Sequence, residues 1–137
     1  MNGWDDLDEW IEEEAERIVK KAKTEAGEVF LRSVTKPYSG GNTPVLSGNL
    51  MANTEVGVNR PQNGLNMSED KTGKETFFDG LWRIKQADAW SSIYITNATP
   101  YNIQAEFEGW KTKGFGVTPA YRYWQLSYND MLEAINK

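Results

Sequence analysis

The sequence predicts an α+β fold: a long N-terminal amphipathic helix packed on a small antiparallel β-sheet, with short helices that include a C-terminal one. Three observations predict it. Apolar residues recur at helical intervals from residue 4 to 34 without an internal proline. Two short segments, near 54–58 and 92–97, alternate apolar and polar residues as strands do. A proline at position 119 precedes a last stretch with helical spacing. With 137 residues, we expect one domain over 1–137.

The first helix is expected over about residues 4–34, which is on the order of 45 Å at 1.5 Å per residue. Its apolar positions are spaced by three or four residues, and they are Trp4, Leu7, Ile11, Ala15, Ile18, Ala22, Ala26 and Val29, widened by Trp10, Val19, Phe30 and Val34. Pro37 and the Gly40-Gly41 pair then break the helix. Such a wide apolar face exceeds what one small core requires, and a homo-oligomer would use the excess.

The middle of the chain reads as strand, loop, helix and strand. Thr54, Val56 and Val58 alternate with other residues in the first strand. The polar segment 59–75 is rich in turn formers, so we expect a loop or exposed hairpin tip that is flexible in the isolated chain. A short helix over about 75–87 and a strand from Ser92 to Asn97 follow.

The last part is expected to hold two helices separated by a loop. Pro100 suits the first turn of a short helix that ends at Gly109. Residues 111–116 are expected to form a loop. Pro119 then opens the final helix, whose apolar side is formed by Tyr123, Leu126, Met131, Leu132 and Ile135.

Composition argues against most catalytic and metal-binding chemistry. Cysteine and histidine are absent, which excludes disulfides, thiolate ligands, and Ser-His or Cys-His nucleophile pairs. Glu106 and Glu108 could form a glycosidase pair, but residues two apart on a helix point in different directions. We therefore expect no enzyme, no metal and no cofactor. No apolar run approaches the roughly 20 residues that span a bilayer, so no membrane association is expected.

Charge is divided unequally along the chain. The net charge is −5, yet residues 1–16 carry acids and no base, namely Asp5, Asp6, Asp8, Glu9, Glu12, Glu13, Glu14 and Glu16. Like charge would keep DNA mobile in a conduit, so Glu12, Glu13 and Glu16 are candidates to line a channel. The alternative is a solvated helix start, favoured by the helix dipole. No basic stripe predicts tight nucleic-acid binding.

The chain is rich in aromatic residues, with six Trp and six Tyr. Aromatic faces could stack on sugar rings. Trp4, Trp10, Trp82 and Trp90 lie on apolar faces of expected elements, which favours packing in the core or at a subunit interface. A second set lies near an expected loop and is the candidate partner surface, namely Trp110, Tyr121, Tyr123 and Trp124.

Two short motifs stand out. The first contains Thr43, Pro44, Ser47, Gly48 and Leu50. The second contains Asn97, Pro100, Tyr101, Glu106 and Gly109, with Phe107 beside the glutamate. All are turn, capping or packing residues: an asparagine can end a strand and bond nearby backbone, and a glycine permits positive φ.

This pattern resembles the head–tail joining, tail-completion or neck proteins of long-tailed double-stranded DNA bacteriophages. The sequence differs from the family pattern where Leu46 stands for a frequent Asp, Asn102 for the usual Ala, and Glu108 is an extra residue. The resemblance implies a virion protein, assembled in the host cytoplasm, that forms a homomeric ring at the head–tail junction. A sixfold ring would contact the head-completion or connector protein and the tail terminator or tail-tube protein, and DNA would pass without specific binding.

Three alternatives remain open at the level of sequence. A tail terminator that caps the tail tube would carry the same features. A carbohydrate-binding module would use the Trp and Tyr surface as a monomer. A glycan hydrolase would use carboxylates.

Overall fold

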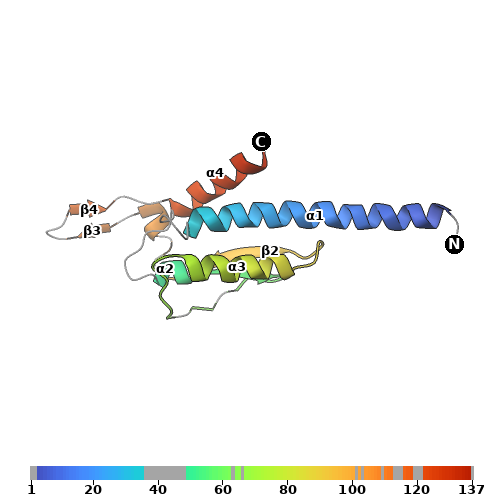
Figure 1. Ribbon diagram of the computed structural model, residues 1–137. Helices are drawn as coiled ribbons and strands as arrows, with labels where there is room; N and C mark the ends of the chain where they lie inside the picture. Colours follow the sequence, from blue (N-terminus) through green and yellow to red (C-terminus); the bar gives the residue numbers. More distant parts are fainter. Residues whose placement is uncertain are drawn as a thin grey trace.

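The computed structural model describes most of the chain. The described residues are 3–35, 49–62, 64, 65, 67–100, 102, 104–108, 110–112, 116–118 and 122–136. Their arrangement confirms the α+β fold class, with a long first helix, a two-stranded antiparallel sheet, and short helices that include the C-terminal one (Figure 1). None of the described helices combines the length and apolar character that crossing a bilayer requires.

Helix α1, Gly3–Thr35, is the predicted long helix. Its 33 residues measure about 50 Å at 1.5 Å per residue. Only its last turns are buried, and there Leu31 and Val34 have no exposed surface. The second half of α1 therefore provides the helix's share of the core.

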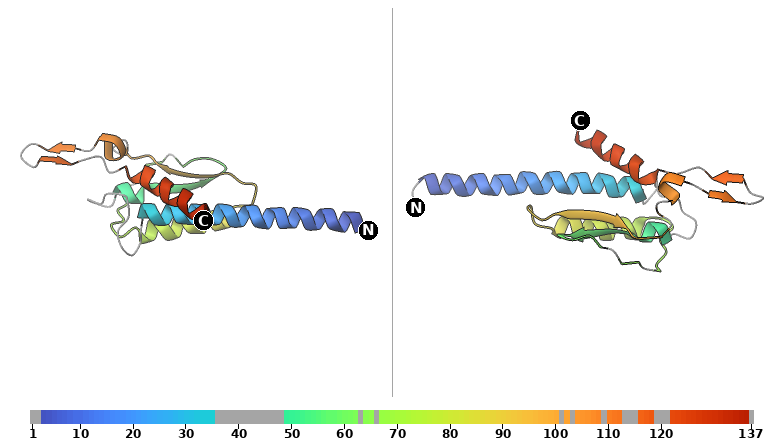
Figure 2. Two further views of the ribbon diagram at one scale, coloured as in Figure 1. Left: turned by 90° about the horizontal axis from the view of Figure 1, so that it is seen from above. Right: turned by 180° about the vertical axis from the view of Figure 1, so that it is seen from behind.

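The main core forms where α1 meets a helix and a two-stranded sheet. Strand β1, Thr54–Val58, pairs antiparallel with β2, Ile93–Asn97, and Val56 lies opposite Ile95. Helix α3, Lys74–Gln86, covers one face of this sheet, and α1 runs alongside (Figure 1, Figure 2). The buried cluster consists of Leu31, Val56, Phe77, Leu81 and Ile84, with Ile93 and Ile95 packed against it.

Gly80 explains how α3 approaches so closely. A Cβ at this position would lie 2.9 Å from Leu31 Cδ1 and 3.1 Å from Val56 Cγ2. The glycine that weakens the predicted helix therefore lets α3 contact both α1 and β1.

A second, smaller cluster holds the C-terminal helix. Helix α4, Tyr123–Ile135, packs against α1, and the rings of Phe30 and Trp124 meet edge to face at 5.0 Å. Tyr123 packs with Leu50, which belongs to the four-residue helix α2, Asn49–Ala52. The sequence did not predict α2, because four residues carry too little periodicity to show a helix.

Three expectations for the last part of the chain differ from the structure. Within 111–116, predicted as a loop, the described residues instead belong to two strands that pair antiparallel, β3, Trp110–Thr112, and β4, Gly116–Thr118. A short helix expected between Pro100 and Gly109 is present in the described residues, but most of it is a π-helix, Gln104–Glu108. Helix α4 begins at Tyr123, four residues after Pro119.

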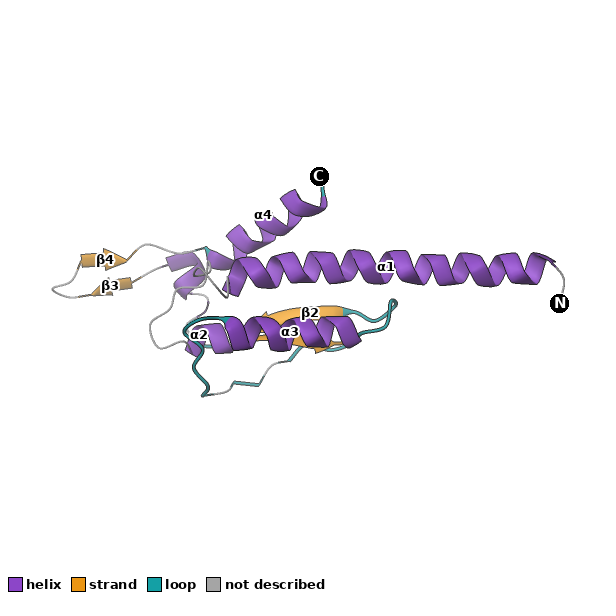
Figure 3. Cartoon of the chain, viewed as in Figure 1, coloured by secondary structure: helices purple, strands orange, loops and turns teal. Residues whose placement is uncertain are grey.

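The segment 59–75 contains no helix or strand before Lys74 in its described residues (Figure 3). Its start is attached to the sheet, since Asn59 Oδ1 accepts the Ser92 N–H at 3.1 Å and the Gln62 carbonyl accepts Thr96 Oγ1 at 2.6 Å. Met67 is 85% exposed. The flexibility of this segment in the isolated chain stays a prediction.

The first half of α1 projects beyond the other elements (Figure 1, Figure 2). Helices α3 and α4 have 13 residues each, about 20 Å, so neither is long enough to cover all of α1. Side chains expected to pack in the core or at a subunit interface are exposed in the single chain, with values of 75% for Trp4, 42% for Leu7, 58% for Trp10, 51% for Ile11 and 56% for Ile18. Within the described chain, this apolar face remains substantially exposed.

Candidate functional site

Asn97 joins the two sequence motifs. At the end of β2, its Nδ2 donates to the Leu50 carbonyl at 2.7 Å. Its Oδ1 accepts the N–H of Thr99 at 3.1 Å and the Thr99 hydroxyl at 2.6 Å, which closes a turn. Asn102 Nδ2 donates to the Asn97 carbonyl. One asparagine thus fixes the end of β2 against α2 and against the segment that follows it.

Leu50 supplies the apolar part of this junction. It is 6% exposed and packs against Tyr123 at the start of α4. Pro100, by contrast, is exposed at the surface. Several motif residues lie outside the described part of the chain, namely Thr43, Pro44, Ser47, Gly48, Tyr101 and Gly109.

Glu106 caps helix α4. Its carboxylate is 7% exposed, and its two oxygens accept the N–H groups of Trp124 at 2.8 Å and Gln125 at 2.9 Å. Arg122, the residue before the helix, has a left-handed conformation with φ 48° and makes no capping bond with its side chain. Glu106 therefore replaces the missing local cap, and its negative charge lies at the favourable end of the helix dipole.

The predicted partner surface is only partly present. Tyr123 is 2% exposed, so the expectation that it contacts a partner is wrong: Leu50, distant in sequence, buries it. Trp124 is half-buried. The side chain of Trp110 and the whole of Tyr121 lie outside the described residues.

An apolar groove nevertheless lies beside this junction. Its volume is about 630 Å³, and aromatic rings from Phe107, Trp124 and Tyr128 line it together with Asn97 and Glu106. Phe107 is 64% exposed. Since Asn97 and Glu106 use their polar atoms on the backbone of this chain, the rings are the groove's main means of contacting a ligand.

The candidate channel residues Glu12, Glu13 and Glu16 are all exposed on the first half of α1. Glu13 and Glu16 border a shallow groove with Arg17, Lys20 and the turn around Trp90. That turn is held to α1 by Lys23, whose ammonium donates to the carbonyls of Ala89, at 2.7 Å, and Ser91. The exposed acids Glu12, Glu13 and Glu16 thus lie where α1 begins to project beyond the other elements.

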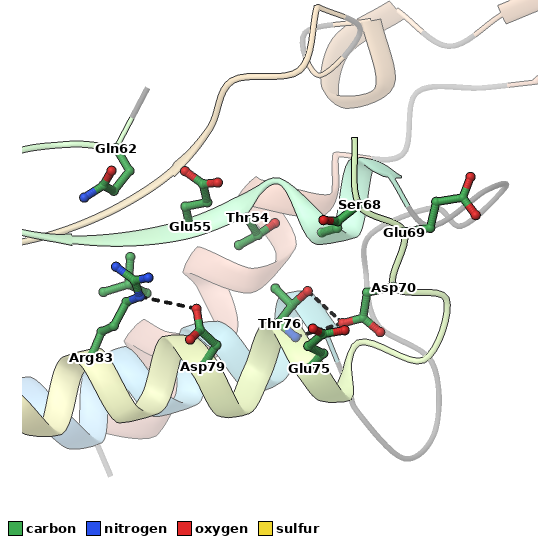
Figure 4. Close-up of a pocket in the computed structure, with 12 residues that line it drawn as sticks. Thr54, Glu55, Gln62, Ser68, Glu69, Asp70, Glu75, Thr76, Asp79 and Arg83 are labelled. Atoms are coloured by element: carbon green, nitrogen blue, oxygen red, sulfur yellow. Dashed lines mark hydrogen bonds and ion pairs between the residues drawn. The ribbon is translucent and has the colours of Figure 1, made fainter. Parts of the chain in front are cut away.

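A polar pocket of about 360 Å³ lies between β1, α3 and the segment before α3 (Figure 4). Two of its carboxylates have partners: Asp79 forms an ion pair with Arg83 at 3.3 Å, and Asp70 bonds to Thr76 (Figure 4). Asp70 Oδ2 accepts the Thr76 N–H at 2.8 Å and hydroxyl at 2.7 Å, while Oδ1 accepts the Gly73 N–H at 2.9 Å. The buried carboxylate therefore organises the start of α3.

The same hydrogen bonds control the ionisation of Asp70. Burial alone raises the pKa of its carboxyl, but the donors on Thr76, Gly73 and Thr72 together hold the pKa below its ordinary value. A carboxyl whose pKa is lower in the folded state stabilises the fold above its unfolded-state pKa. That contribution is lost as the pH falls through the folded-state pKa.

The two glutamates considered as a glycosidase pair lie in different environments. Glu106 is buried and occupied as a cap, whereas Glu108 is exposed. Among the residues that the structure describes, no group of three or more carboxylates, histidines or cysteines could hold a metal ion. The site is a structural junction with an aromatic groove beside it.

Sequence reasoning missed two features. The first is the role of Asp70 at the start of α3: Asp70 and Thr72 precede this helix, and such residue types signal a helix start. Phe78 and Trp82, spaced by four residues, form a second apolar stripe on α3 and are 50% and 62% exposed. Their spacing could have shown that α3 has an apolar side facing away from its core.

No family model, no curated protein and no solved structure matches this chain.

Replacing Glu106 with glutamine tests its capping role. The variant places an amide NH₂ opposite one of the two backbone N–H groups, so we expect a loss of about 1–2 kcal/mol in the free energy of unfolding. Urea unfolding measures this. Glu108→Gln, an exposed neighbour, is the control and should be unchanged; equal stability of both variants would rule out the cap.

Replacing Asp70 with asparagine should cost about 1–3 kcal/mol at neutral pH, since donors then face an amide NH₂. Glu69→Gln, an exposed carboxylate in the same segment, should have little effect. The difference between Asp70→Asn and the parent should shrink as the pH falls through the lowered pKa of Asp70. A difference that persists unchanged in acid would contradict the role of the carboxylate charge.

Proposed function

We propose that this chain is a structural subunit of the neck of a long-tailed bacteriophage. It forms a homomeric ring, sixfold as the resemblance implies, that joins the head connector to the tail and lets DNA pass. Two arguments support the proposal. The long helix on a small antiparallel sheet is the fold that the motif resemblance implies. The described motif residues Leu50, Asn97 and Glu106 serve a structural junction.

One observation carries the proposal: the chain exposes large apolar side chains that a lone subunit does not need. Four tryptophans are more than half exposed, at 75% for Trp4, 58% for Trp10, 62% for Trp82 and 67% for Trp90. Monomers rarely expose large contiguous apolar patches, and such patches mark sites of association. An assembly subunit would bury them against its neighbours.

The projecting half of α1 suits this role for a second reason. It combines its apolar face with exposed acids, including Glu12, Glu13 and Glu16. In a ring, acids that face the centre would repel DNA and keep it mobile. Acids beside the apolar face would instead favour docking of the helix on a surface of opposite charge.

A carbohydrate-binding role is the second candidate, favoured by the aromatic groove. Phe107, Trp124 and Tyr128 line a volume of about 630 Å³, which would accept a sugar ring against an aromatic face. Saturable binding on a glycan array by a strictly monomeric chain would favour this candidate over the ring.

Native mass spectrometry over a range of concentrations tests self-association. We expect a monomer that converts to a closed oligomer as the concentration rises. The double variant Leu7→Ser/Ile11→Ser should weaken association strongly while changing the free energy of unfolding by only about 0.5 kcal/mol, because both side chains are exposed.

The control is Met67→Ser, which removes an exposed apolar side chain from the loop and should leave association unchanged. Negative-stain micrographs of the oligomer should then show rings. A chain that stays monomeric at every concentration, and that does not enter phage particles, would contradict the proposal.

A further inference from the structure

We propose that the first half of α1 docks on the outer stripe of α3 in a second copy of this chain. The inference rests on the proposed ring and names the two surfaces that form it. The outer stripe of α3 is defined here as Lys74, Phe78, Trp82 and Lys85. The projecting stripe of α1 is defined as Leu7, Ile11 and Ile18, with Trp4 at its start.

Both stripes are apolar, exposed and of matching length. The residues of the outer stripe are spaced by four, four and three, so they share one flank of α3, which borders the face that buries Phe77, Leu81 and Ile84. Phe78 is 50% and Trp82 62% exposed. From residue 4 to 18, α1 offers about 20 Å of helix, which equals the length of the 13-residue α3.

Charge complementarity selects this pairing. Apolar residues of the projecting stripe alternate with acids, including Asp8 and Glu12 beside Ile11, and the first 16 residues contain no base. The outer stripe begins and ends with the exposed lysines Lys74 and Lys85. The acids beside the projecting stripe and the lysines of the outer stripe attract one another when the two apolar surfaces pack together.

The same charges argue against pairing of the projecting stripe with itself. Two copies of residues 4–18 laid side by side would bring acids against acids in either orientation. If two copies of α1 paired antiparallel with a shift, the acids of one could face the basic second half of the other. That half is obstructed, because α3 and α4 already pack there. A surface on a different element is therefore the better partner.

The geometry of the pairing also suits a ring. Each copy has one projecting stripe and one outer stripe, on different elements. Each copy can then bind a neighbour through each stripe, which is a head-to-tail contact that closes into a ring when the rotation allows it.

Cysteine cross-linking tests the pairing directly, because the chain contains no cysteine of its own. Ile11→Cys and Phe78→Cys are made as separate variants, mixed under reducing conditions at a concentration where the parent assembles, and then oxidised. A disulfide requires the two Cβ atoms to come within about 4.5 Å, so the pairing predicts a mixed disulfide joining the two variants. Peptide mass spectrometry identifies the joined peptides.

The matched control replaces Phe78→Cys with Gln86→Cys, an exposed position on α3 outside the stripe. We expect the mixed disulfide with Phe78→Cys to exceed the control by about tenfold or more, given that distance requirement. The double variant Ile11→Cys/Phe78→Cys should give a ladder of covalent oligomers that stops at the ring size. Equal yields with both positions, or a dominant disulfide between two Ile11→Cys chains, would overturn the pairing.

A charge exchange gives a second readout. Lys85→Glu should weaken self-association about two- to fivefold, as expected for a partly exposed ion pair, and Glu12→Lys in the same chain should restore part of it. Arg60→Glu, an exposed base outside α3, is the control. Weakening by Arg60→Glu as large as that by Lys85→Glu would overturn the role of the stripe.

These experiments separate the two proposals. A chain that remains monomeric overturns both the ring and the docking surface. A chain that assembles without the mixed disulfide overturns only the docking surface, and leaves the ring to be built by other contacts.

Discussion

The length of α1 is the constraint on which the rest of the structure depends. A helix of 33 residues spans about 50 Å, whereas α3 and α4, which pack against it, span about 20 Å each. The core therefore gathers at the C-terminal half of α1, around Leu31 and Val34. Since the apolar pattern continues to Trp4, the remaining half has a surface suited to burial that stays largely exposed within the described chain. Assembly with other copies would bury this surface.

Long-range polar contacts hold the core elements in place. Asn97 bonds to Leu50 across 47 positions of sequence, and Glu106 caps a helix that begins 17 positions later. These contacts satisfy backbone groups that a turn or a helix end would otherwise leave unpaired. The polar side-chain atoms of both residues are thereby engaged in holding the fold together. The acids of α1, by contrast, remain at the surface, where they can bias the choice of partner.

The local spacing of apolar residues predicts much of the secondary structure, but it does not predict what each element packs against. The spacing of apolar residues predicts α1, β1, α3 and β2, because each has enough residues to show its period. The pairing of β3 and β4 was missed, since three-residue strands show almost no alternation. Tyr123 was placed on a surface because it follows a loop, yet Leu50 covers it. Tertiary packing decides which face of an element a distant segment covers. The local sequence of that element does not show this.

Amide hydrogen exchange across concentration tests the central claim most directly, namely that the first half of α1 becomes buried on assembly. At low concentration, amides of residues 3–16 should exchange much faster than those around Leu31, since few tertiary contacts of the described chain protect a projecting helix. When the chain assembles, protection of residues 3–16 should rise by about tenfold or more, while that around Leu31 changes little. Assembly without added protection in this segment would contradict the account.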